Sequence, residues 1–200
     1  MKHEGWSAHE ILGVPLDARA SARLERFEAQ LLALAVPMGM ISKGDVPRLR
    51  ERHLLDCLRA LPLLDANDRR LCDLGAGAGL PGLVLACVRP DLEIVLTEVR
   101  RNRASFLERA VVDLELSNVR VWGRRIETLR ERFDVCTARA FGPAPRAWSA
   151  AERLLEPSGR LVYWAGERFD IADVPDGVAT TLFETPALAR SGALAIMSRQ

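Results

Sequence analysis

A glycine-rich stretch, Asp73 to Gly82, contains the residue types best suited to hold a small ligand. It joins a predicted strand to a predicted helix, and glycines recur in it at Gly75, Gly77 and Gly79. Glycine has no Cβ, so it allows a tight turn and a close approach of the backbone to a ligand. The dinucleotide-binding spacing G-x-G-x-x-G would need a third glycine where Leu80 stands. The loop therefore predicts a ligand in which no pyrophosphate has to be cradled.

A carboxylate, Glu98, stands where the next apolar run ends, directly after Ile94-Val95-Leu96-Thr97. In α/β folds that bind nucleosides, an acid at the end of the second strand accepts hydrogen bonds from the ribose hydroxyls. The loop and this acid together predict a cofactor that contains a nucleoside. Two other interpretations stay open, a related fold that binds nothing and a simply solvated Glu98.

Short apolar runs alternate with helical patterns after Arg70, which is typical of a parallel sheet with crossover helices. We predict strands at residues 71–74, 93–98, 118–122, 133–138 and 160–164, and helices near residues 80–89, 102–116, 126–132 and 145–155. Two further strand-like runs, 179–185 and 188–198, suit an antiparallel hairpin at a sheet edge. The expected fold is α/β, an open and mostly parallel seven-stranded sheet with helices on both faces.

The N-terminal third has helical patterns instead. Apolar residues recur at helical spacing over residues 21–36, and a second helix begins near Asp45, a plausible N-cap with Pro47 in its first turn. We therefore predict a helical extension over residues 1–65, packed on a domain formed by residues 66–200.

Composition limits the function classes. The 28 basic residues nearly balance the 27 acidic ones, so the whole chain has no strong field for nucleic acid or membranes. No run reaches the roughly 18 apolar residues of a membrane span, and residues 1–13 show no signal-peptide pattern. The four cysteines form no C-x-x-C pair, and with three histidines no zinc spacing can be written. We expect a cytoplasmic monomer without a metal.

Four further segments accompany the glycine loop: Arg52-His53-Leu54-Leu55-Asp56, Gly79-Leu80-Pro81-Gly82, Phe106-Leu107-Glu108 and Thr137-Ala138-Arg139-Ala140-Phe141. With the G-x-G-x-G spacing, they resemble the RsmG family, also called glucose-inhibited division protein B, the guanine-N7 methyltransferases of bacterial 16S ribosomal RNA. The resemblance runs from about residue 31 to the C-terminus. It implies a Rossmann-like class I methyltransferase fold, S-adenosylmethionine as methyl donor, and the 530 loop of 16S rRNA, free or in the small ribosomal subunit, as substrate.

The resemblance also implies site residues. Glu98 would bind the ribose, Ile126 and Glu127 would border the adenine, and the methionine part would lie against Asp73, Gly75, Ala76, Gly77, Gly79 and Leu80. Arg125 and Arg139 match arginines characteristic of the family and would act in catalysis by holding the cofactor carboxylate or the RNA. A solvated helix start for Arg125 and a structural ion pair for Arg139 are the alternatives.

Substrate RNA would contact five residues: His53, Arg100, Arg101, Arg103 and Arg125. The segment from Glu98 to Arg125 has seven arginines against four acids, and part of this charge is expected to face the cofactor crevice. A solvated helix face is the alternative for this charge. For His53, a bridge between the N-terminal helix and the domain competes with plain packing.

The chain departs from the family pattern in several places. Met40-Ile41-Ser42 replaces the usual N-L-T, Cys57 replaces a serine, and Ala165 replaces the lysine of the L-K-G motif. Two other functions therefore stay open: a diverged paralogue that methylates another RNA or a small molecule, and a catalytically silent RNA-binding or assembly factor.

Overall fold

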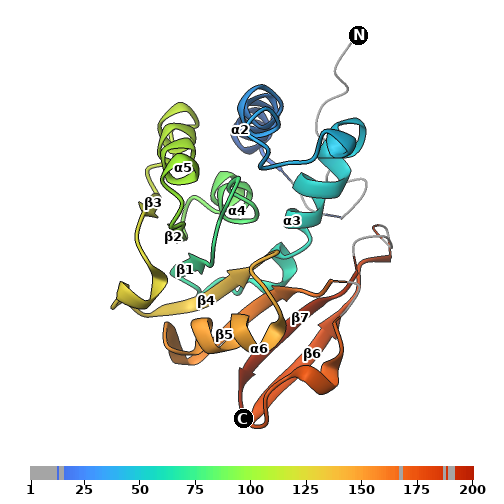
Figure 1. The fold of residues 1–200 in the computed structure, drawn as a ribbon, viewed down its shortest axis with the longest axis vertical. Helices are drawn as coiled ribbons and strands as arrows, with labels where there is room; N and C mark the ends of the chain where they lie inside the picture. Colours follow the sequence, from blue (N-terminus) through green and yellow to red (C-terminus); the bar gives the residue numbers. More distant parts are fainter. Residues whose placement is uncertain (1–12, 14–15, 167–168, 187, 189–191) are drawn as a thin grey trace.

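A single seven-stranded sheet forms the centre of the protein (Figure 1). The computed structural model describes residues 13, 16–166, 169–186, 188 and 192–200. The strand order is β3-β2-β1-β4-β5-β7-β6. The strands are β1 (Arg70–Asp73), β2 (Glu93–Thr97), β3 (Val119–Trp122), β4 (Phe133–Ala138), β5 (Leu155–Trp164), β6 (Val178–Phe183) and β7 (Leu194–Arg199).

Strands β1 to β5 pair in parallel, whereas β7 pairs antiparallel with both β5 and β6. This arrangement confirms the predicted open, mostly parallel sheet with an antiparallel C-terminal hairpin. The first strand of the hairpin, β6, is not the one that pairs with β5. Instead β7 lies against β5, and β6 forms the outer edge.

Neighbouring residues of each central strand enter different cores, because successive side chains point to opposite faces of a sheet. Leu71 and Ile94 belong to one apolar cluster, and Cys72 and Val95 belong to the other. Helices α4 (Gly82–Val88) and α5 (Arg101–Asp113) cover the first face, and α6 (Ala144–Glu152) covers the second (Figure 1). Helices on both faces were predicted, and this prediction is confirmed.

The N-terminal segment packs on the first face. Leu24 and Phe27 of α2 (Ala18–Gln30) are fully buried in the same cluster as residues of α4 and α5. Asp17 caps α2 by accepting the Ala20 N–H at 2.7 Å, so this helix starts earlier than predicted. It is followed by η1 (Leu31–Ala35), η2 (Lys43–Arg48), η3 (Arg50–Leu55), α3 (Asp56–Leu58) and η4 (Leu61–Leu63).

Two local predictions are wrong. Asp45 is not the cap of the second helical segment, because the Ser42 hydroxyl accepts the Gly44 N–H there. The helix predicted over residues 126–132 is a single turn, η5 (Ile126–Thr128). Beyond that turn Leu129 is extended and buried in the second core, so the chain runs directly toward β4. A second such turn, η6 (Ile171–Asp173), follows β5.

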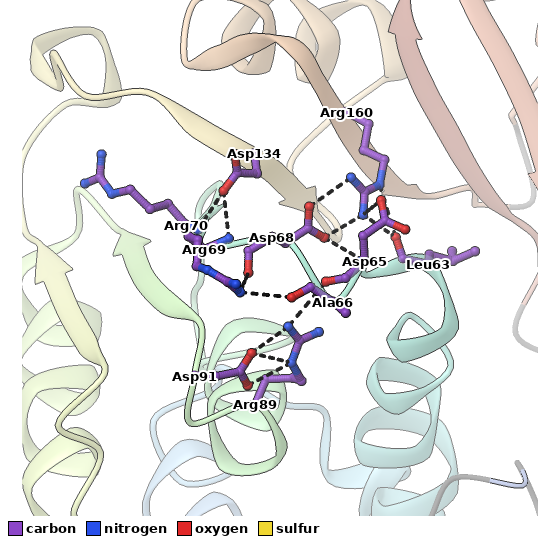
Figure 2. Close-up of polar contacts among 10 residues, drawn as sticks. All are labelled: Leu63, Asp65, Ala66, Asp68, Arg69, Arg70, Arg89, Asp91, Asp134 and Arg160. Atoms are coloured by element: carbon purple, nitrogen blue, oxygen red, sulfur yellow. Dashed lines mark hydrogen bonds and ion pairs between the residues drawn. The ribbon is translucent and has the colours of Figure 1, made fainter.

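The connection from η4 to β1 is fixed by a polar cluster at the amino ends of the strands (Figure 2). Arg160 of β5 donates to both carboxylate oxygens of the buried Asp68, at 3.1 and 2.6 Å, and also to the Leu63 carbonyl. Asp134 of β4 accepts the N–H groups of Arg69 and Arg70 at 2.8 and 2.9 Å. These bonds tie the linker to two strands that are distant in sequence.

Replacing Arg160 by alanine is expected to lower the free energy of unfolding by about 3 kcal/mol, because it leaves the buried Asp68 carboxylate without its bidentate partner. Denaturant unfolding measures this change. Arg109→Ala is the matched control, since its ion pair with Asp113 is largely exposed and should be worth less than about 1 kcal/mol. Equal losses in the two variants would contradict the role given to the Asp68 pair.

Candidate functional site

A pocket of about 610 Å³ opens at the carboxyl edge of the sheet, where β1 and β2 end. Ligands of open α/β sheets bind at this edge, and the volume lies in the range of small-molecule sites. The glycine loop and the end of β2 meet in its wall. The lining residues are Gly75, Thr97, Glu98, Val99, Arg124, Arg125, Ile126, Glu127, Phe141, Arg146, Ser149, Ala150 and Arg153.

Asp73 holds the glycine loop in place. Its side chain is fully buried, and its two carboxylate oxygens accept hydrogen bonds from the Thr137 hydroxyl at 2.9 Å and the Gly82 N–H at 3.0 Å. A Cβ on Gly82 would lie 2.7 Å from an Asp73 oxygen, so only glycine fits there. Burial raises the pKa of Asp73 to about 6, although the two hydrogen bonds and Arg139 oppose this rise.

Thr97, which is not among the predicted site residues, links the loop to β2. Its hydroxyl donates to the Asp73 carbonyl and accepts the Gly75 N–H, both at 3.0 Å. The Thr97 carbonyl accepts the Ala76 N–H at 2.8 Å. These bonds direct the start of the loop along the end of β2, which brings Gly75 next to the acid that follows Thr97.

Phe141 closes the pocket over Gly75. A Cβ at Gly75 would lie 2.8 Å from the Phe141 ring, so glycine permits this close approach. The preceding Ala140 has φ +54°, a left-handed conformation that turns the chain after β4, and the Gly142 carbonyl accepts the Tyr163 hydroxyl at 2.9 Å. The R-A-F segment noted in the sequence thus shapes a wall of the pocket.

Glu98 lines the pocket although it is only 6% exposed. One of its oxygens accepts the Arg100 N–H at 2.8 Å. The other accepts no hydrogen bond from the described part of the chain, so it is available to a ligand hydroxyl. This geometry suits the role predicted for Glu98.

Three more predicted residues line the opposite wall. Arg125 is largely exposed and lies 3.5 Å from Glu127, its only described ionic partner, and Ile126 is half-buried beside them. The neighbouring Trp122 donates from its indole N–H to the Arg125 carbonyl at 3.4 Å, and Arg124 lies over its ring. Trp122 therefore supports the loop that carries this wall.

Arg139 and His53 lie together outside the described pocket lining. They belong to a cluster of ion pairs and hydrogen bonds with Asp56 and Asp45, which we call the ionic clasp. Arg139 donates to Asp56 at 3.0 Å and to the Arg52 carbonyl at 3.1 Å, and it lies 3.0 Å from Nδ1 of His53. Burial and the nearby Arg139 lower the pKa of His53, so a neutral ring accepts from Arg139 and donates from Nε2 toward Asp45. The clasp joins the N-terminal segment to the end of β4.

The remaining predicted residues lie beside the pocket. Arg100 caps α5, Arg101 begins it, and Arg103 reaches within 3.8 Å of the Cβ position of Gly77. Ala76, Gly77, Gly79 and Leu80 form the turn above β1, outside the described lining. Of the seven arginines between Glu98 and Arg125, two line the pocket. Arg146, Ser149, Ala150 and Arg153 were missed, and only their i, i+3, i+4, i+7 spacing could have indicated a shared helix face.

No metal site is found among the described residues, since no group of three or more His, Cys, Asp or Glu side chains could hold an ion there. All four cysteines are buried and free. Within the described part of the chain, no helix is long and apolar enough to cross a membrane. His3 and His9 lie outside the described residues.

The sequence matches a known family over most of its length. The profile described as rRNA small subunit methyltransferase G covers residues 20–172. The chain belongs to this family. A protein of this name from Acidothermus cellulolyticus is 42% identical over 143 residues, which cover 72% of this chain and 64% of that protein. Another from Halorhodospira halophila is 37% identical over 188 residues, covering 92% of this chain and 89% of the relative. The family prediction is thereby confirmed.

A solved structure supports the fold. A mutant of MtNAS in complex with S-adenosylmethionine superposes with a TM-score of 0.57 at 16% identity, covering 96% of this chain and 82% of that one. At this identity the likeness concerns the fold alone. The match to the Acidothermus protein spans somewhat less than two thirds of that relative's length.

Replacing Asp73 by asparagine is expected to remove a pH dependence of stability. Between pH 3.8 and about 6 the folded state binds more protons than the unfolded state, so the free energy of unfolding falls as the pH rises through this range. Relative to Asp73→Asn, the wild type should lose about 3 kcal/mol across it. Denaturant unfolding at several pH values measures the difference, with the exposed Asp113→Asn as control. A constant difference would contradict the buried, titrating carboxyl.

Proposed function

We propose that this protein uses S-adenosylmethionine to methylate the small-subunit ribosomal RNA, at N7 of a guanine in the 530 loop of 16S rRNA. The observation that carries the proposal is the meeting of the glycine loop and Glu98 in one pocket large enough for a nucleoside cofactor. Family membership supports both the reaction class and the RNA substrate. We also propose that the protein acts as a monomer. A cytoplasmic location belongs to the proposal too, since ribosomal RNA is found in that compartment.

The residues fit the cofactor in three places. The free oxygen of Glu98 would accept hydrogen bonds from the ribose hydroxyls, and Ile126 would border the adenine, beside Glu127. The backbone of Gly75 would lie against the methionine part, with Phe141 excluding water above it. Asp73 would act by positioning the loop, because both of its oxygens are already used within the protein.

The reaction needs alignment more than proton transfer. The cofactor supplies an electrophilic methyl group on a sulfonium. Guanine N7 has an unshared electron pair and no proton to lose, so the protein must hold it in line with that methyl group. The lining accords with this demand, because its described residues include no histidine or cysteine and its two glutamates flank the predicted ribose and adenine positions. Arg125 remains a candidate for orienting either the cofactor carboxylate or the RNA.

Glu98→Ala is expected to weaken S-adenosylmethionine binding by about 1 to 3 kcal/mol, because the ribose hydroxyls would then be buried without a partner. Isothermal titration calorimetry measures this affinity. Glu108→Ala is the control, since Glu108 is exposed on α5, away from the pocket lining. Unchanged affinity in Glu98→Ala would refute the assigned role, and no binding by the wild type at millimolar ligand would favour a silent assembly factor.

Deleting the gene is expected to remove N7-methylguanosine from the 530 loop of 16S rRNA. Mapping of this modification in the deletion strain tests the substrate, with a strain expressing the Glu98→Ala variant as a second arm. Intact methylation in the deletion strain would overturn the assignment and favour a paralogue with another substrate.

A further inference from the structure

A second, smaller hollow adjoins the pocket just beyond the C-terminal end of α6. The smaller cavity, of about 150 Å³, shares Glu127 and Arg153 with the larger one. We call the two together the α6 groove. Its lining contains six arginines against the glutamates Glu98, Glu127 and Glu131, and these arginines are Arg124, Arg125, Arg130, Arg132, Arg146 and Arg153.

One face of α6 forms a side of this groove. Arg146, Ser149 and Ala150 lie at i, i+3 and i+4 on the helix, and Arg153 follows it at i+7, so all four project to one side. At a rise of 1.5 Å per residue the two arginines are about 10.5 Å apart along the helix axis. The opposite face, which includes Trp148, is buried in the second core. The helix is thus anchored by one face and presents guanidinium groups on the other.

Several of these guanidinium groups lack a neutralising carboxylate. Among the described residues no carboxylate pairs with Arg124, Arg130 or Arg146, whereas Arg153 lies close enough to Glu127 to help lower the pKa of that carboxyl. Glu131 already pairs with Arg70 and Arg120, and Glu127 pairs with Arg125. Arg146 instead lies over the Phe141 ring, 5.4 Å from its centre. Guanidinium groups without a carboxylate partner make the local potential positive, so the arrangement favours an anionic ligand.

The groove is open because no crossover helix covers it. Between β3 and β4 the chain makes only the single turn η5 before Leu129 turns into the core. Figure 1 shows α6 on this side of the sheet and the β3–β4 connection running beside it without a full helix. Arg130 follows that turn and reaches the smaller cavity. The shortened connection therefore exposes the basic face of α6.

We propose that the α6 groove binds the backbone phosphates of a single-stranded segment of the RNA substrate, with Arg146 and Arg153 as phosphate contacts; this rests on the proposed function. The cofactor alone does not account for the charge. S-adenosylmethionine has one carboxylate beside an ammonium and a sulfonium, whereas an RNA strand has a phosphate at every nucleotide. A single strand is favoured because the target base must leave its stack to reach a methyl group inside a pocket.

Arg146→Ala and Arg153→Ala test the proposal on a 16S rRNA fragment containing the 530 loop. Each substitution is expected to raise the KM for RNA about fivefold, to leave kcat within about twofold, and to lower the salt slope of RNA binding by about 0.7. Arginine-to-lysine substitutions at the same positions should restore most of the slope. Arg19→Ala is the matched control, because Arg19 is exposed on α2, which packs on the other face of the sheet, and has no described ionic partner. Calorimetry with S-adenosylmethionine on the same variants separates a loss of RNA contacts from a loss of cofactor binding.

The possible results of these experiments distinguish a failure of the α6 groove proposal from a failure of the proposed function. Unchanged RNA binding and KM in both alanine variants, beside an active wild type, would overturn the groove alone. Weakened cofactor binding with unchanged RNA binding would overturn it as well, since the arginines would then belong to the cofactor site. A wild type that neither binds nor methylates the fragment would refute the proposed function, and the groove proposal with it.

Discussion

The buried carboxylate of Asp73 is the constraint on which the site depends. It lies at the end of β1, the strand between β2 and β4, and its two oxygens join the start of α4 to the end of β4. Burial raises the pKa of this carboxyl, so keeping it ionised in the core lowers the free energy of unfolding. The hydrogen bonds of Asp73 fix the geometry of the loop between β1 and α4, and those of Thr97 connect this loop to β2. Gly75, Glu98 and Phe141 can line a single pocket because each lies shortly after one of the strands that these hydrogen bonds join, namely β1, β2 and β4.

The ionic clasp extends the same order to the N-terminal segment. Asp56 accepts from both Arg59 and Arg139, and the indole N–H of Trp164 donates to its carbonyl at 3.2 Å. Arg139 thereby loses much of the freedom it would need to act directly on a substrate. Its position suits a second role, because it holds the R-A-F turn against η3 and so fixes the chain that ends in Phe141. A family arginine can be essential to a site through such a contact without touching the reacting atoms.

The sheet was predictable because each strand is a short apolar run, and the alternation with helices leaves few possible topologies. The position of the glycine loop and Glu98 at the carboxyl edge of the sheet was predictable because both directly follow strands, and Gly75 and Glu98 indeed line the pocket there. Two kinds of feature could not be predicted from the sequence. The helix expected at 126–132 fails because the burial of Leu129, a tertiary contact, overrides local helical preference. Arg146 and Arg153 were missed because charged residues on a helix usually indicate a solvated face, and only the fold shows that this face borders the pocket.

The near balance of acidic and basic residues acquires a different meaning once their partners are known. Many arginines form ion pairs with carboxylates of the same chain, among them Arg160 with Asp68 and Arg89 with Asp91. Such pairs cancel at short range, and at physiological salt an unpaired charge acts over only about 8 to 10 Å. What an RNA strand would experience is therefore the local set of unpaired guanidinium groups and not the net charge of the chain. Under the proposed function, the basic groove would add to the attraction for RNA at the place where the methyl donor would lie, although the net charge of the chain is close to zero.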